Sequence, residues 1–92
     1  MASQTILAQV PGTLSTLVNE RYLTYNVAFD IEVKQLPGAR GGIDDEAIAR
    51  VSLTRGHNVP DGSPYTARYA YRGRKYESTG LRVQDGHLLA GF

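Results

Sequence analysis

The feature that most constrains this chain is a long alternation of residue types over Tyr22–Leu36, with the sequence YLTYNVAFDIEVKQL. Strict alternation over this length predicts a β-strand with one buried face and one solvated face. At helical spacing the same apolar residues would spread around the whole circumference. Strands average about five or six residues, so we expect this one to bend or to serve two sheet surfaces. The residues predicted on its buried face are Leu23, Tyr25, Val27, Phe29, Ile31 and Val33.

The length and composition predict one ordinary globular domain. The 92 residues are 41% hydrophobic and 21% charged, which allows a single modest core over residues 1–92. The chain has no cysteine, which excludes a disulfide framework, a thiolate metal site and cysteine catalysis. No apolar run reaches the roughly 20 residues of a membrane-spanning helix, and the N-terminus lacks a signal-peptide pattern. We expect a soluble, cytoplasmic protein without membrane association.

The charges are distributed unevenly along the chain. Residues 1–45 carry three basic and five acidic side chains, a net charge of −2, whereas residues 46–92 carry seven basic and four acidic ones, a net charge of +3. Arginine supplies eight of the ten basic residues, and its planar guanidinium suits phosphate or carboxylate binding. Nucleic-acid-binding domains typically have an isoelectric point above about 9. The isoelectric point of this chain is lower, about 8.1.

The N-terminal part of the chain predicts one short strand, a turn and one ambiguous segment. Gln4–Val10 alternates as a strand does, and Pro11-Gly12 is a dipeptide typical of turns. Thr13–Asn19 fits either a helical face or a strand, and its serine, threonine and valine content favours the strand. The long strand follows and is expected to end at Pro37-Gly38.

A glycine-rich loop follows the long strand. Its sequence is PGARGG, over Pro37–Gly42, and we predict a mobile binding loop or a plain crossover. Backbone N–H groups of such a loop can hold an anion, but the lysine and Ser/Thr of a phosphate-binding loop are missing. A plain loop is therefore favoured. The residues of the candidate mobile loop are Gly38, Arg40, Gly41 and Gly42.

The segment Asp44–Ser52 has features of both a helix and a strand. Asp44 is a suitable N-cap, and acidic residues in a first turn are favoured by the helix dipole. Ala49, Val51 and Leu53 instead alternate with polar residues as in a strand. We predict a strand over about Ala47–Arg55, preceded by one helical turn. The alternative is an α+β fold with one short helix around residues 44–52.

The C-terminal part predicts a three-strand meander. His57–Pro64 is expected to be a surface loop, because Pro-Asp-Gly and Ser-Pro both specify turns. Two hairpins follow, with turns at Arg72-Gly73 and Asp85-Gly86, and Asp-Gly between alternating runs is a strong hairpin signal. About six short strands in a chain of this length predict a mostly β fold, namely a small antiparallel barrel or sandwich of the size of an OB or SH3-like barrel.

The strongest candidate for a binding surface is the first of these hairpins, over residues 65–78. A two-residue turn would place Tyr69 opposite Tyr76 and Arg68 opposite Glu77. A tyrosine-lined face beside arginines resembles the stacking surfaces of single-strand nucleic-acid-binding proteins. The interpretation that we favour is that the tyrosines cover the core. The candidate binding residues are Arg68, Tyr69, Tyr71, Arg72, Arg74, Lys75 and Tyr76.

Other polar groups give weaker signals for chemistry. Asp30 and Glu32 share the solvated face of the long strand, but their spacing matches no cation-binding loop. His57, Asp61 and Ser63 lie within one turn, which rarely gives the geometry of a catalytic triad. His87 follows a hairpin turn, as an exposed strand-end residue does. We therefore predict no catalytic residues, no metal site and no cofactor.

These observations favour a non-enzymatic binding or assembly module that acts through protein–protein contacts. Enzymes of this size seldom form a deep pocket with a supporting shell. The apolar segment Leu88–Phe92 would leave a strand edge that a second copy of the chain can cover, so we expect a homo-oligomer. The alternative is single-stranded nucleic-acid binding through the hairpin of residues 65–78.

Overall fold

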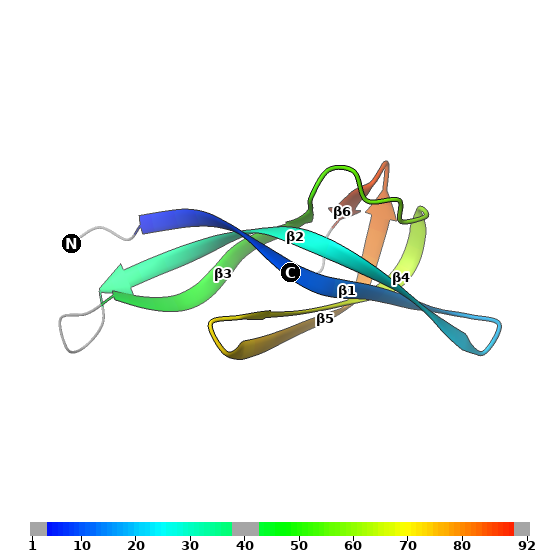
Figure 1. Cartoon of the computed structure of the whole chain (residues 1–92), viewed down its shortest axis with the longest axis horizontal. Coiled ribbons are helices and arrows are strands. Elements are labelled where there is room, and N and C mark those ends of the chain that lie inside the picture. The colour runs from blue at the N-terminus through cyan, green and yellow to red at the C-terminus, as the bar shows by residue number, and fades with distance from the viewer. Residues whose placement is uncertain (1–3, 38–42, 90–92) are drawn as a thin grey trace.

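The computed structural model describes residues 4–37 and 43–89. They form one antiparallel sheet with the strand order β3-β2-β1-β4-β5-β6 (Figure 1). The outer strands β3 and β6 also contact each other, so the sheet curls into a nearly closed small barrel. The described residues contain no helix, which confirms the barrel prediction and shows that the α+β alternative was wrong. The strands are β1 (Gln4–Val18), β2 (Arg21–Pro37), β3 (Ile43–Leu53), β4 (Gly62–Tyr71), β5 (Arg74–Gln84) and β6 (His87–Leu89).

Strand β2 confirms the long alternation and divides into two parts. Residues 29–35 pair with β1 on one side and with β3 on the other, whereas residues 21–28 pair with β1 alone. In the first part Phe29 and Ile31 are fully buried, as predicted. In the second part Leu23 is 45% exposed, and its predicted burial was wrong. Alternation identified the face of the strand correctly, but it could not show where the barrel ends along it.

The polar face of β2 is less exposed than predicted. Ala28, Asp30 and Glu32 are each half-buried. The Asp30 carboxylate accepts hydrogen bonds from the Gln9 amide, at 3.0 Å, and from the Thr54 hydroxyl, at 3.1 Å. Side chains from both neighbouring segments therefore cover this face, which the sequence of β2 alone did not indicate.

Strand β1 runs through Pro11-Gly12 without a break, and the turn predicted there was wrong. The pairing of β1 with β2 is continuous from Gln4 to Val18, and Pro11 faces Ala28. Proline is tolerated in a strand where its missing N–H would point away from the neighbouring strand. Pairing with β4 begins only at Gly12. The missing N–H of Pro11 therefore costs no ladder hydrogen bond on the β4 side either.

Gly12 is required by a close approach inside the barrel. A Cβ atom at this position would lie 2.5 Å from the backbone oxygen of Arg68 and 2.7 Å from Cε2 of Phe29. Such distances are far shorter than ordinary contacts between non-bonded carbon and oxygen atoms. The glycine lets β4 and the Phe29 ring pack directly against β1, and this is its structural role in place of a turn.

Strand β3 confirms the strand predicted over Ala47–Arg55, but it begins earlier, at Ile43, and ends earlier, at Leu53. Residues 43–45 already pair with β2, where Asp44 faces Leu36, so the predicted helical turn was wrong. The acidic residues resembled the first turn of a helix in sequence. Pairing with the long neighbouring strand instead satisfies their backbone groups. Two irregularities in register interrupt this pairing, between Glu32 and Val33 and between Lys34 and Gln35.

The C-terminal meander β4-β5-β6 confirms the predicted hairpins. Both turns have two residues with positive φ, at Arg72-Gly73 and at Asp85-Gly86, as expected for type I′ turns. The loop predicted over His57–Pro64 ends earlier, because β4 begins at Gly62. The Thr16 hydroxyl donates a hydrogen bond of 2.8 Å to the Pro64 carbonyl, which ties this first part of β4 to β1.

The core lies between the two halves of the barrel. Five strands supply buried side chains to it, and Val59 from the β3–β4 loop adds one more. The Tyr65 hydroxyl donates to the Pro60 carbonyl at 2.7 Å, so this buried ring keeps its polar atom satisfied. The largest fully buried side chains are Phe29, Leu14, Ile31, Leu81, Val33 and Val83.

Candidate functional site

The hairpin β4–β5 has the register that the sequence predicted. Tyr69 faces Tyr76, Arg68 faces Glu77 and Tyr71 faces Arg74. Tyr69 is 7% exposed, while Tyr71 and Tyr76 are half-buried. The tyrosine face therefore turns towards the core at Tyr69 and becomes accessible only towards the Arg72-Gly73 turn.

The rings of this face form a continuous aromatic row. The centroids of Phe29 and Tyr69 are 5.4 Å apart with an interplanar angle of 52°, and those of Tyr69 and Tyr76 are 5.2 Å apart and nearly parallel. Burial raises the pKa of the Tyr69 hydroxyl, and the nearby Tyr76 raises it further. The row thus anchors the hairpin to the core, since aromatic pairs stabilise beyond the area that they bury.

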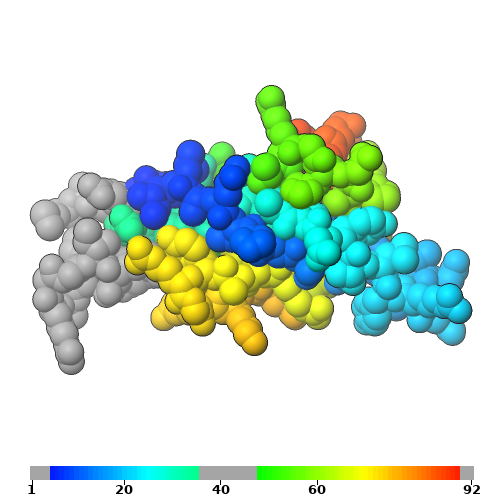
Figure 2. All heavy atoms as spheres, in the orientation of Figure 1, coloured from blue at the N-terminus to red at the C-terminus, as the bar shows by residue number. Residues whose placement is uncertain are grey.

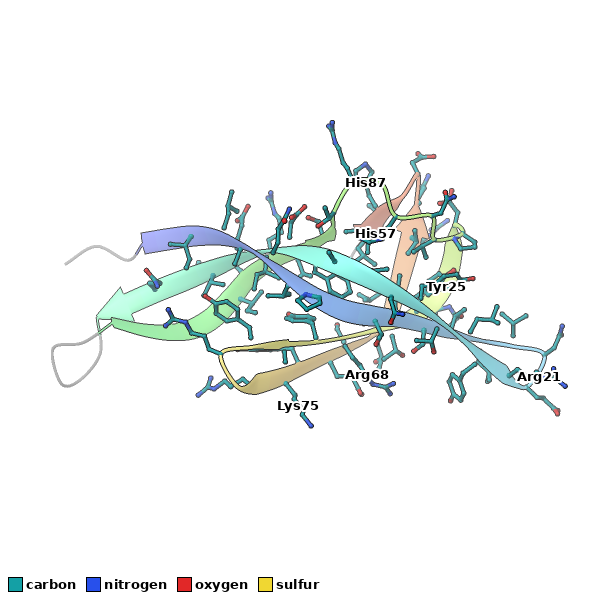
Figure 3. All side chains as sticks on the ribbon, in the orientation of Figure 1. Arg21, Tyr25, His57, Arg68, Lys75 and His87 are labelled. Carbon is teal, nitrogen blue, oxygen red and sulfur yellow. The ribbon has the colours of Figure 1, made fainter. Side chains whose placement is uncertain are left out.

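Arg68, which is labelled in Figure 3, forms an ion pair with Glu77 on the outer face of the hairpin. The Arg68 Nε donates to Glu77 Oε2 at 2.6 Å. This hydrogen bond and the charge of Glu77 raise the pKa of the already strongly basic Arg68. Arg68 therefore has an acidic partner within its own sheet, as predicted from the sequence.

The basic side chains nearest the turn are Arg72, Arg74 and Lys75. All three are exposed, and the Arg72 guanidinium lies 5.9 Å from the centroid of the Tyr71 ring. An open hollow of about 320 Å³ lies on this hairpin and is lined by residues of both strands, including Lys75 and Tyr76. This end of the hairpin combines positive charge with accessible aromatic edges.

The remaining polar candidates do not converge on one site. His57 accepts a hydrogen bond at Nε2 from the Ala28 N–H, at 2.9 Å, whereas Asp61 accepts one from the Gly86 N–H, at 3.5 Å. Glu32 lies 3.6 Å from Arg50. Among residues 4–37 and 43–89, no three His, Cys, Asp or Glu side chains gather as a metal site would require. The candidate loop of Gly38, Arg40, Gly41 and Gly42 lies outside the described residues.

A second surface, which the sequence analysis did not identify, lies at the far end of the β1–β2 hairpin. We call residues 16–24 the arm, because they extend beyond the body of the molecule at the right of Figures 1 and 2. Its turn residues Asn19 and Glu20 both have positive φ, which gives a tight two-residue connection. Neither β3 nor β4 pairs with residues 16–18 or 21–24.

The arm carries most of the large exposed apolar side chains of the described residues. Leu17 and Tyr22 face each other on its outer side, while Leu23 lies on the opposite side near Val18. Their exposed fractions are 56% for Leu17, 44% for Val18, 75% for Tyr22 and 45% for Leu23. The only clue in the sequence was that apolar residues continue on both faces around Asn19-Glu20.

The chain matches no protein-family model, no curated protein and no solved structure. No helix of the described residues is long and apolar enough to cross a membrane. The arm and the basic end of the β4–β5 hairpin are the two candidate sites, because they combine exposure with apolar surface in the first case and with positive charge in the second.

Proposed function

We propose that this protein is a non-enzymatic assembly module that associates with further copies of itself through the arm. The observation that carries the proposal is the exposure of Leu17, Val18, Tyr22 and Leu23 on a two-stranded projection. Each side of the arm presents two neighbouring exposed apolar side chains, and a concentration of such side chains on one part of a domain marks an interaction site. An isolated two-stranded hairpin is also only marginally stable in water, so a partner would complete its packing.

The arm is a better candidate for this contact than the C-terminal segment Leu88–Phe92 on which the sequence analysis relied. Within the described residues β6 comprises only His87–Leu89 and lies beside β5 and β3. Leu88 is half-buried there, while Leu89 is 40% exposed. The arm offers more exposed apolar surface than Leu88 and Leu89 do, and the rest of that segment, residues 90–92, lies outside the described residues.

The double substitution Leu17→Ser/Tyr22→Ser is expected to weaken self-association at least about tenfold. Burying one large apolar side chain contributes roughly 1.5–3 kcal/mol, and each 1.4 kcal/mol corresponds to about a tenfold change in affinity. Sedimentation velocity from low to high micromolar concentration measures the effect. The matched control is Leu7→Ser, which removes an apolar side chain that is 77% exposed on the same strand but outside the arm.

A wild-type protein that stays monomeric at high micromolar concentration would contradict the proposed function. Equal weakening by Leu7→Ser and by the arm variant would also contradict it, because the contact would then not be specific to the arm.

The second candidate function is single-stranded nucleic-acid binding at the basic end of the β4–β5 hairpin. The observation that favours it is the exposure of Arg72, Arg74 and Lys75 next to the half-buried rings of Tyr71 and Tyr76. Tyr69 is buried and paired with Phe29, so only the two outer tyrosines would be available for stacking.

If this surface binds single strands, affinity for an oligonucleotide should fall steeply with salt. Replacing Arg74 and Lys75 with Gln should reduce the slope of log affinity against log salt concentration by roughly 0.7 for each lost phosphate contact. Tyr71→Ala should weaken binding by about 1–3 kcal/mol without changing the slope. Fluorescence anisotropy with labelled oligonucleotides measures both quantities. Absence of binding at about 50 mM salt, where electrostatic attraction is strong, would eliminate this candidate.

A further inference from the structure

The backbone of β2 presents an unpaired edge over residues 22–26, along the arm and the two residues that follow it. The two-residue turn makes Val18 and Arg21 the first hydrogen-bonded pair of the β1–β2 ladder, and such pairs recur at every second residue. Leu23, Tyr25 and Val27 therefore direct their N–H and C=O groups to β1. The alternate residues direct theirs away from it, and these are Tyr22, Thr24, Asn26 and Ala28.

The hydrogen bonds of Ala28 confirm that even-numbered residues of this part of β2 direct their N–H and C=O groups away from β1. They also mark where the open edge ends. The N–H of Ala28 donates to Nε2 of His57, at 2.9 Å, and its C=O accepts from the N–H of Thr54, at 3.0 Å. Both groups point to the side of β3, as the alternation requires. The β3–β4 loop therefore closes the edge at Ala28, and the outward groups of Tyr22, Thr24 and Asn26 have no β3 residue beside them.

Two other strand edges of the described residues carry features that hinder pairing. β3 has two irregularities in its register with β2, and β1 has Pro11, which has no N–H to offer. Bulges and prolines are among the devices by which sheet edges avoid unwanted pairing. The edge formed by residues 22–26 has neither a bulge nor a proline, and no charged residue lies within it.

We propose that this edge pairs with the same edge of a second copy, antiparallel and centred on Thr24. The inference rests on the proposed function, because it assigns the geometry of the same self-association. A two-fold axis at Thr24 makes the contact self-complementary, as dimers with closed symmetry require. The outward N–H and C=O groups of Tyr22 and Asn26 then bond to those of Asn26 and Tyr22 in the other copy, and the pairing continues each sheet into the next.

The side chains and charges fit this register. Leu23 of one copy faces Tyr25 of the other on the inner side, and Arg21 faces Val27, so no like charges meet across the ladder. The pairing ends there, because the β3–β4 loop already occupies the edge beside Ala28. The turn residue Glu20 of the second copy would approach this loop, which carries the exposed Arg55. Acidic Glu20 of one copy and basic Arg55 of the other would then lie towards the same end of the paired segment, and this complementarity of charge favours a second copy as the occupant of the edge.

Thr24→Pro tests the pairing directly. Proline removes the N–H that lies on the proposed axis, and this N–H points away from β1, so the ladder of the monomer keeps its hydrogen bonds. We expect the variant to lose at least about tenfold in self-association while its circular dichroism spectrum stays that of a β protein. The matched control is Leu7→Pro, since Pro11 shows that odd-numbered residues of this part of β1 direct their N–H away from β2. The control should associate like wild type.

Amide hydrogen exchange in the wild-type protein provides a test without substitution. On passing from dilute to concentrated protein, the amides of Tyr22, Thr24 and Asn26 should gain protection, whereas those of Leu23 and Tyr25 should change little because β1 already binds them. If association persists in Thr24→Pro, or if the amides of residues 22–26 gain no alternating protection, the pairing is overturned. The proposed function survives that result if Leu17→Ser/Tyr22→Ser still weakens association, and fails with it if the wild type remains a monomer.

Discussion

Replacing Phe29 with alanine is expected to lower the free energy of unfolding by about 3–5 kcal/mol. Phe29 is the largest fully buried side chain, and its ring packs against Tyr69 and approaches Gly12. Its removal leaves a cavity inside the barrel that the curled sheet cannot easily close. Domains of this size have a total stability on the order of 5–15 kcal/mol, so the variant should retain little of it.

Urea denaturation followed by tyrosine fluorescence or circular dichroism measures this loss. Leu7→Ala is the matched control, because Leu7 is apolar and lies on the neighbouring strand but is 77% exposed. It should change stability by no more than about 0.5 kcal/mol. Similar, small changes for both variants would show that the core is not organised around Phe29.

Gly12→Val is expected to lower the free energy of unfolding by about 3 kcal/mol or more, at the upper end of the cost of overpacking. Local preference predicts the opposite sign, since valine is favoured in strands and glycine is not. The close approach decides the outcome, because the new Cβ atom would meet the Arg68 carbonyl at 2.5 Å. A backbone oxygen within a paired strand cannot move without disturbing the β1–β4 ladder.

Thermal unfolding can show whether Gly12→Val lowers or raises stability, since 1 kcal/mol shifts the melting temperature of a domain of this size by about 4–8 °C. Pro11→Ala is the control at the neighbouring position, where the side chain is exposed, and it should have a small effect. A melting temperature of Gly12→Val equal to or above that of wild type would contradict the packing of β4 against β1.

The sequence was informative where structure depends on local pattern. The alternation around Phe29 identified a strand and its buried face, and the dipeptides Arg72-Gly73 and Asp85-Gly86 located two hairpin turns. The register of β4 and β5 followed from the first of these turns. In each case, neighbouring residues alone determine the outcome, through strand periodicity or through the positive φ that a type I′ turn requires.

The sequence was misleading where distant segments decide the structure. Pro11-Gly12 resembles a turn until Phe29 and Arg68 are known to lie against it. Asp44 resembles a helix cap until its pairing opposite Leu36 is known. The arm was missed because the alternation gives the face of Leu23 but not the point at which neighbouring strands stop covering it. The candidate site therefore depends on where the pairing of β3 with β2 and of β4 with β1 ends. No single stretch of sequence contains that information.

The order of strands in the sheet also has a consequence for synthesis of the chain. β1 lies between β2 and β4, and the contact of Thr16 with Pro64 joins residues that are 48 positions apart. At a translation rate of about 5–20 residues per second, β4 emerges about 2–10 s after β1. During that interval the β1–β2 hairpin can form, but the edge of β1 that later pairs with β4 has no partner strand. The nascent chain therefore passes through a stage in which β1 has an open edge, and such an edge can pair with other chains until β4 covers it.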